Sequence, residues 1–331
     1  MQMPDKDYIL TLKDFIDIQE WQKIQDDFSA ITGVGVRTLD FKGLAFTRIS
    51  GEPRLCSELL KNHWAREEIC GSCLPTFLGG SRTVDKNLSF SCHSGLHNFI
   101  APLRASNRVF GYIIVGPVIL IARKPREQYR EITEELNVEL DSFWSALSEI
   151  KVMSFRSVQS VIELIKDVAE YSLKLAYQSI TKEEEVMMLD STKLNRVLNA
   201  LLEVAFQVSG AQIGSIMLVD KDKNELTIRI SKGLSDEVVK NTKVRLGNGI
   251  SGIAAQEGKA FLLDDKLEDN RIKGYLNRPN IASSMVIPIR VEDKVMGVMN
   301  LGASKASEVR FNANNVNVVN SLVDLATLAV G

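Results

Sequence analysis

The spacing of apolar residues changes twice in the first third of the chain. Between residues 10 and 31 apolar side chains recur three and four positions apart, which predicts a helix. From residue 34 to residue 49 they alternate with polar ones, which predicts two strands joined by a turn at Gly43. Residues 98–120 alternate again, and this predicts a second hairpin with its turn at 104–108.

The pattern of the second hairpin returns later in the chain. Five of its residues recur at one constant offset, without a gap: Pro102, Arg104, Val109, Gly111 and Gly116 correspond to Pro288, Arg290, Val295, Gly297 and Gly302. A repeat of this kind indicates two copies of one fold. The alternative is chance, because all strands favour a similar set of residues.

The stretch between the two copies has helical spacing over residues 154–178, and the spacing resumes over 194–208 after the charged residues 182–185. Such spacing suits a parallel dimer seam or a helix that packs on its own sheet. Both interpretations stay open. In either case the connection is helical, which suits a relay better than a flexible tether would.

The length of 331 residues is more than one ordinary core needs and suits two domains of about 150 residues. We therefore predict an α+β chain with two tandem domains of the same type, each an antiparallel sheet flanked by helices. The predicted domains are residues 1–152 and 193–331, and a long helical linker joins them at 153–192. Apolar residues make up 45% of the chain, which is enough for a core in each domain.

Charge and hydropathy restrict the possible partners. A net charge of −2 provides no basic surface, so we expect no nucleic-acid binding by this region. The start of the chain is acidic and has no secretory signal, and the longest apolar run, residues 110–122, is too short to cross a bilayer. We expect a cytoplasmic protein without a membrane segment, in which thiols stay reduced.

All four cysteines and all three histidines lie between Cys56 and His97. Cys70 and Cys73 are separated by two residues, a gap that lets both thiolates reach one ion around a tight turn, and Cys56 and Cys92 flank them. Thiolates that lie close together repel one another unless a cation neutralises them. We predict that these four cysteines bind one zinc ion or iron–sulfur cluster, with His93 as a substitute ligand.

Other interpretations of the cysteines stay open. They can be buried packing residues, because cysteine is among the most buried residue types. A thioredoxin-like redox pair is a further interpretation, but it requires a helix that starts after a parallel strand, and Gly71 and Ser72 lie in no such pattern. The spacing does not decide between zinc and an iron–sulfur cluster.

Residues 10–150 resemble the PocR sensory domain. The resemblance is carried by Cys56, Cys70 and the stretch Cys92–Phe99, followed by Ala101–Leu103. It implies a PAS-like module, found in bacterial and archaeal transcription regulators and histidine kinases, that is thought to sense small alcohols or acids. Family members usually have serine where Cys73 stands here, so this chain has a fourth thiol that completes a tetrahedral ligand set.

Residues 193–331 resemble a GAF domain. The resemblance is carried by the strand 214–220, the glycine loop 247–252 and the paired segments 284–290 and 297–301. It implies a fold used for small-molecule binding and dimerisation. The glycine loop lacks the spacing of a phosphate-binding loop, so we interpret it as a turn that opens a helix packed on the sheet.

Two cofactors and one ligand class of the GAF family do not fit this sequence. No cysteine or histidine follows His97, so we expect neither haem nor bilin in the GAF domain. Cyclic-nucleotide binding in the family goes with a phenylalanine followed by Asp-Glu, whereas Phe311 is followed by Asn312 and Ala313.

We expect a non-catalytic sensor that detects a small molecule or redox state at the first domain and relays it through the linker and a GAF homodimer. The expected output is a kinase or a transcription regulator, in a partner or after Gly331, because the last helix ends without a polar cap. A thiol-dependent reductase that uses the clustered cysteines is the alternative. A dimerisation scaffold is a third interpretation.

Overall fold

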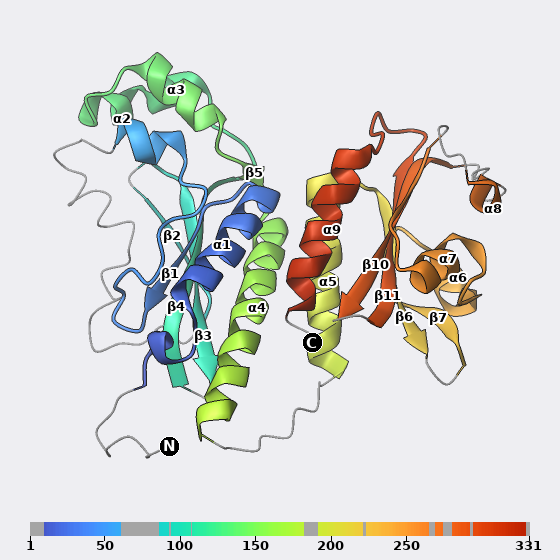
Figure 1. Ribbon diagram of the computed structural model, residues 1–331. Coiled ribbons are helices and arrows are strands. Elements are labelled where there is room, and N and C mark those ends of the chain that lie inside the picture. Colours follow the sequence, from blue (N-terminus) through green and yellow to red (C-terminus); the bar gives the residue numbers. More distant parts are fainter. Residues whose placement is uncertain are drawn as a thin grey trace. The chain divides into compact units, whose positions relative to one another are not determined.

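The computed structural model describes residues 10–60, 86–92, 94–106, 108–181, 191–220, 223–264, 269–273, 280–291 and 294–328. Contacts divide the chain into two compact units, Met1–Glu185 and Val186–Gly331, which are described separately below. Each unit combines an antiparallel sheet with helices, so the predicted α+β class is confirmed (Figure 1). None of the helices in the described ranges is long and apolar enough to cross a membrane.

The sheet of the first unit has the strand order β1-β4-β3-β2, with antiparallel neighbours, and β5 pairs with β4 in parallel. The strands are β1 (Val36–Asp40), β2 (Leu88–Ser91), β3 (His97–Ala105), β4 (Arg108–Leu120) and β5 (Val152–Met153). Strands β3 and β4 form the hairpin predicted for residues 98–120.

Two long helices cover one face of this sheet. They are α1 (Ile18–Thr32) and α4 (Phe155–Thr181). Helix α1 docks through Trp21, whose indole Nε1 donates to Thr38 Oγ1 at 2.8 Å, and α4 docks on β3 through Phe155, whose ring lies 5.9 Å from that of Phe99. The first part of the predicted linker therefore packs on the sheet of its own unit.

The shorter helical elements of the first unit lie before α1, around the cysteine segments and after β4. They are η1 (Leu12–Asp14), η2 (Leu55–Leu59), η5 (Arg126–Tyr129), α2 (Arg130–Glu135) and α3 (Leu140–Ser148). Helices α2 and α3 lie together at one end of the sheet, beside η2 (Figure 1).

The second strand predicted within residues 34–49 is not regular. Only isolated bridges join this segment to β1, between Leu39 and Ala45 and between Val36 and Ser50. Backbone hydrogen bonds between Val36 and Ser50 support the second bridge, and the fully buried Gln25 of α1 adds to them by donating from Nε2 to the carbonyl oxygens of Val36 and Arg48 at 3.0 Å. The alternation was a correct sign of an extended segment, but the strand prediction was wrong.

The sheet of the second unit has the antiparallel order β8-β7-β6-β11-β10-β9. Its strands are β6 (Ile213–Asp220), β7 (Glu225–Lys232), β8 (Lys243–Arg245), β9 (Phe261–Leu263), β10 (Ile281–Val291) and β11 (Lys294–Ser304). Helices α5 (Ser191–Ser209) and α9 (Ala313–Thr327) cover one face, and α6 (Asp236–Asn241), α7 (Gly249–Glu257) and α8 (Asn270–Lys273) lie on the other side (Figure 1).

The repeat found in the sequence has a counterpart in the strand register. In the first unit Leu103 pairs with Gly111 and Arg104 with Val109, which leaves Phe110 as the extra residue of a bulge. In the second unit the corresponding pairs are Ile289 with Gly297 and Arg290 with Val295, which leave Met296. Both hairpins therefore carry a bulge at the same place, as two copies of one fold would.

Candidate functional site

Cys56 lies in η2, a single turn of π-helix. The Pro53 carbonyl oxygen accepts from the Cys56 N–H at 2.8 Å and from the Ser57 N–H at 3.0 Å, and the Leu60 N–H donates to Leu55 at 3.1 Å. Turns of this wide type occur frequently at functional sites. Leu55 is fully buried, whereas the Cys56 side chain is half-buried. The turn thus fixes a thiol at the border of the core.

Cys92 occupies the turn between β2 and β3. Its N–H donates to the Leu96 carbonyl oxygen at 2.8 Å, and its own carbonyl oxygen accepts from the Gly95 N–H at 2.9 Å. The side chain is half-buried. Cys92 and residues 94–99, which carry part of the family resemblance, therefore belong to a tight turn and the beginning of β3.

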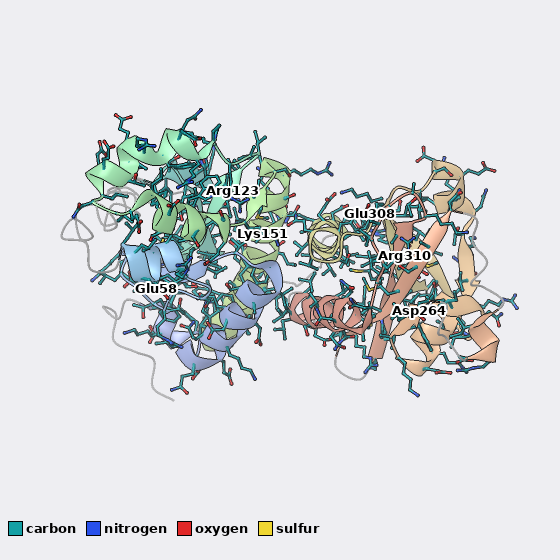
Figure 2. All side chains as sticks on the ribbon, turned by 90° about the horizontal axis from the view of Figure 1, so that it is seen from above. Glu58, Arg123, Lys151, Asp264, Glu308 and Arg310 are labelled. Atoms are coloured by element: carbon teal, nitrogen blue, oxygen red, sulfur yellow. The ribbon has the colours of Figure 1, made fainter. Side chains whose placement is uncertain are left out.

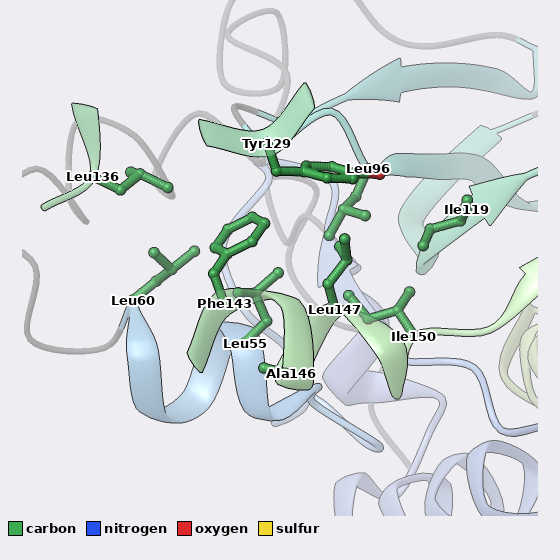
Figure 3. Close-up of a cluster of buried hydrophobic side chains, with 10 residues drawn as sticks. All are labelled: Leu55, Leu60, Leu96, Ile119, Tyr129, Leu136, Phe143, Ala146, Leu147 and Ile150. Atoms are coloured by element: carbon green, nitrogen blue, oxygen red, sulfur yellow. The ribbon is translucent and has the colours of Figure 1, made fainter. Parts of the chain in front are cut away.

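The two cysteine segments meet at one hydrophobic cluster, which lies between the end of the sheet and helices α2 and α3 (Figure 3). Leu55 is the first residue of η2 and Leu60 follows its last, and both belong to this cluster. Leu96, from the turn at Cys92, also belongs to it, and Cys92 itself packs against it. The remaining members are Ile119, Tyr129, Leu136, Phe143, Ala146, Leu147 and Ile150. The fold therefore brings together two of the predicted ligand segments that are distant in the sequence.

Two arginines hold α3 in place over this cluster. Arg123 donates to the carbonyl oxygens of Ser148 and Ile150, at 2.7 and 2.6 Å, and so binds the end of α3 to the segment after β4 (Figure 2). Arg54, which precedes η2, donates from Nε to Glu149 Oε1 at 2.9 Å. This hydrogen bond to a carboxylate raises the pKa of the Arg54 guanidinium. The turn that carries Cys56 is thereby linked to α3.

The other predicted ligands, Cys70, Cys73 and His93, lie outside the described residues. His97 is the first residue of β3, and its Nδ1 lies 3.3 Å from Ser91 Oγ. Within the described ranges no three His, Cys, Asp or Glu side chains form a group that could hold a metal. Because half of the cysteines are not among those residues, the four-cysteine site stays a prediction.

The second unit contains a pocket of about 330 Å³ between its sheet and helices α6 and α7. Five of its lining residues are polar: Ser215 from β6, Thr242 at the end of α6, Ser251 from α7, Ser284 from β10 and Asn300 from β11. Sequence reasoning missed this pocket. The available signal was Asn300, a polar residue in the middle of an otherwise apolar strand.

The glycine loop that precedes α7 forms the turn expected from the sequence. Its backbone closes through a 2.9 Å hydrogen bond from the Gly247 N–H to the Gly252 carbonyl oxygen, and α7 begins at Gly249. A Cβ atom at Gly252 would lie 2.3 Å from the Arg245 carbonyl oxygen, so the helix start can approach β8 only without a side chain there.

Comparison with protein families confirms both resemblances. Residues 14–177 match the family model of the sensory domain found in PocR, and residues 191–330 match that of a GAF domain. Among curated proteins none matches the chain.

Several solved structures share parts of the fold at low identity. The GAF domain of an Acinetobacter phosphoenolpyruvate-protein phosphotransferase is 18% identical, with a TM-score of 0.36, over 54% of this chain and 94% of its own. A free methionine-R-sulfoxide reductase from Neisseria meningitidis, in complex with its substrate, is 15% identical, with a TM-score of 0.35, over 54% and 91%. The GAF-B domain of DevS from Mycobacterium smegmatis is 20% identical, with a TM-score of 0.33, over 42% and 92%.

Proposed function

The chain joins a PocR sensory domain to a GAF domain, and from this we propose that it is a cytoplasmic, non-catalytic sensory module of a signal-transduction protein. The first unit detects a small molecule or a redox state at its cysteines. The signal passes through α4 and a GAF homodimer to a kinase or transcription output in a partner or a further domain. The observation that carries the proposal is the meeting of the Cys56 and Cys92 segments at one cluster of the sensory domain.

The proposed site holds one zinc ion or iron–sulfur cluster on Cys56, Cys70, Cys73 and Cys92, with His93 as the substitute if one thiolate is absent. Thiolates are preferred ligands of both groups, and four of them complete a tetrahedral zinc site. The half-buried position of Cys56 and Cys92, beside fully buried leucines, suits such a site because it limits access of water to the thiolates.

The two groups would give the site different roles. A structural zinc ion contributes on the order of 10 kcal/mol to folding, comparable to the whole stability of a domain, and would make the site a structural element of the sensor. An iron–sulfur cluster changes with the redox state and would make the site the sensor itself. The GAF unit carries neither haem nor bilin in this proposal, since no cysteine or histidine follows His97.

Anaerobic purification of the full chain, followed by a visible spectrum and metal analysis, tests the proposal. We expect one colourless zinc ion per chain or a brown, oxygen-labile cluster, and we expect Cys70→Ser and Cys73→Ser to lose it. Ser57→Ala, next to Cys56, is the matched control and should keep the metal. A wild-type chain without metal, or cysteine variants with unchanged metal content, would show that the cysteines are packing residues. Thiol-dependent turnover would favour a reductase instead.

A further inference from the structure

Asn248 and Gly249 form the only Asn-Gly pair in the sequence, and they lie where the glycine loop enters α7. Such a pair can react with itself, because a glycine has no Cβ atom to keep its backbone nitrogen away from the preceding side chain. The nitrogen attacks the side-chain carbonyl carbon of the asparagine, which closes a cyclic succinimide and releases ammonia. Water then opens the ring to aspartate or to isoaspartate.

The structure leaves both reacting groups accessible. Asn248 is the N-cap residue of α7, but its exposed side chain makes no capping hydrogen bond. Gly249 is the first residue of the helix, where backbone N–H groups have no partner within the helix. In the part of the chain that the structure describes, no other residue accepts a hydrogen bond from the Gly249 N–H. The reaction therefore has no existing hydrogen bond of these two groups to break.

The glycines of the loop allow the backbone movement that ring closure needs. Asn248 has an extended ψ of 141°, and the bond between its Cα and its carbonyl carbon must rotate to bring the side chain to the Gly249 nitrogen. Gly247 and Gly249, with φ of +82° and +60°, flank it and can absorb this rotation. One 2.9 Å hydrogen bond, from the Gly247 N–H to the Gly252 carbonyl oxygen, closes the loop. A single bond of this kind stabilises a loop only modestly, so the loop can open.

The aspartate product should strengthen the start of α7. Aspartate is a preferred N-cap residue, because its carboxylate accepts hydrogen bonds from the free N–H groups of the first turn. Its negative charge also interacts favourably with the positive end of the helix. Asn248 makes no capping hydrogen bond, so a stronger acceptor at this position has room for improvement.

The isoaspartate product should weaken the same helix start. It adds the side-chain methylene to the main chain, which lengthens the loop between Gly247 and Gly252 and disturbs the hydrogen bond that closes it. The first turn of α7 holds Ile250, which belongs to the hydrophobic core of the second unit, and Ser251, whose Oγ donates to Asn300 Oδ1 at 2.7 Å. A displaced helix start would disturb both contacts.

We propose that Asn248 is a site of spontaneous covalent modification that changes the stability of α7. The Gly249 nitrogen gives up its proton to a base and forms a bond to Asn248 Cγ. The bond from Cγ to Nδ2 breaks, and the amide nitrogen takes up a proton and leaves as ammonia. One water molecule then adds to either carbonyl group of the ring, so water is the only co-reactant. The modification is independent of the cysteine site of the first unit.

Incubation of the full chain in heavy-oxygen water at a series of pH values, followed by peptide mapping with mass spectrometry, tests the site. We expect Asn248 to convert at least about tenfold faster than Asn224, an exposed turn residue that is followed by Glu225 with its obstructing Cβ atom. The rate should rise with pH, because the attacking nitrogen must lose its proton. Asn248→Gln, which would need a larger ring, is the matched control and should not convert. Equal conversion at Asn248 and Asn224 would overturn the site.

Calorimetry of fresh and aged protein tests the effect on the second unit. Asn248→Asp, which carries the aspartate product from the beginning, should melt a few degrees above the fresh wild type. Aged wild type should melt below Asn248→Asp, by more the larger its isoaspartate fraction in the peptide map. Aged Asn248→Gln should melt as it did when fresh. An aged wild type that melts like the fresh protein would overturn the effect on α7. Neither result bears on the metal content of Cys70→Ser and Cys73→Ser, so the proposed function and this inference can fail separately.

Discussion

Lys151 Nζ donates a 2.6 Å hydrogen bond to the backbone carbonyl oxygen of Thr32. Thr32 ends α1, where the last carbonyl groups have no partner within the helix. Lys151 immediately precedes β5 (Figure 2). Burial lowers the pKa of the Lys151 amine, because desolvation disfavours its charged form. A single side chain thus connects the end of α1 to a strand that is distant in the sequence.

Replacement of this lysine should destabilise the first unit. Lys151→Met leaves the Thr32 carbonyl oxygen without its hydrogen bond, and we expect the free energy of unfolding to fall by about 1 kcal/mol at neutral pH. Urea denaturation of the full chain measures this change. Lys124→Met, at an exposed position, is the control and should have a negligible effect. Equal stability of the two variants would argue against a structural role for Lys151.

The lowered pKa of Lys151 also predicts a pH dependence. Between the folded-state value and the unfolded-state value of about 10.4, the unfolded chain holds more protons than the folded chain. The contribution of Lys151 to the free energy of unfolding therefore increases as the pH rises through that window. The stability difference between wild type and Lys151→Met should grow over the same range. Urea titrations of both proteins at a series of alkaline pH values measure it, and a constant difference would contradict the prediction.

Gln25 should be among the most sensitive polar residues of the first unit. Its Oε1 accepts from the hydroxyls of Thr38 and Thr47, each at 2.9 Å, and its Nε2 donates to two carbonyl oxygens and to Ser50 Oγ. Gln25→Leu keeps the size but leaves several buried groups unpaired, so we expect a loss of about 3 kcal/mol in thermal or urea unfolding. Gln19→Leu, exposed on the same helix, should change stability by no more than about 0.5 kcal/mol.

Loss of one cysteine ligand should affect the two units unequally. If Cys56→Ser prevents metal binding, the first unit should lose a large part of its folding free energy. The second unit contains no cysteine, so its stability should not change. Calorimetry should show a transition that shifts to lower temperature beside one that stays in place. A chelator should reproduce the shift in the wild type. If both transitions stay unchanged, Cys56 has no role in a metal site.

We predict a homodimer through the helical linker and the GAF helices, as expected from their apolar spacing. The rings of Phe155 and Tyr177 contact the aromatic residues Phe99 and Phe110 of the sheet. On the opposite side of α4, a second apolar stripe is also buried within the chain; it is formed by Val161, Leu164, Val168 and Tyr171. The dimer prediction therefore does not rest on an uncovered face of α4.

Light scattering at micromolar concentration tests this prediction. The wild type should be a dimer. A monomeric wild type would contradict the prediction.

Most of the fold was predictable because local patterns decide it. The second hairpin follows from its alternation, and the repeat of Pro102 and Gly111 as Pro288 and Gly297 indicated its copy. The segment before residue 49 pairs with β1 only through isolated bridges, which its alternation does not show. Gln25 is one polar residue within a helical pattern, and its spacing does not show that its amide bonds to the Val36 and Arg48 carbonyl oxygens.

The candidate sites were less predictable. The sequence marked Cys56 and Cys92 only as two of four clustered cysteines, and the approach of their segments to one hydrophobic cluster depends on where Leu55 and Leu96 pack. The polar residues of the GAF pocket come from different elements, and apart from Asn300 each is ordinary within its own strand or helix. Only the pairing of β6 with β11, which places Asn300 opposite Ser215, shows that they form one site.

The bulges at Phe110 and Met296 lie at equivalent positions of the two hairpins, so inward-facing and outward-facing residues follow the same order in both units. A bulge shifts by one residue which side chains point inward and which outward, so the two hairpins change faces at equivalent places. We therefore expect that a chimera exchanging residues 99–111 and 285–297 keeps the order of inward-facing and outward-facing side chains in each sheet.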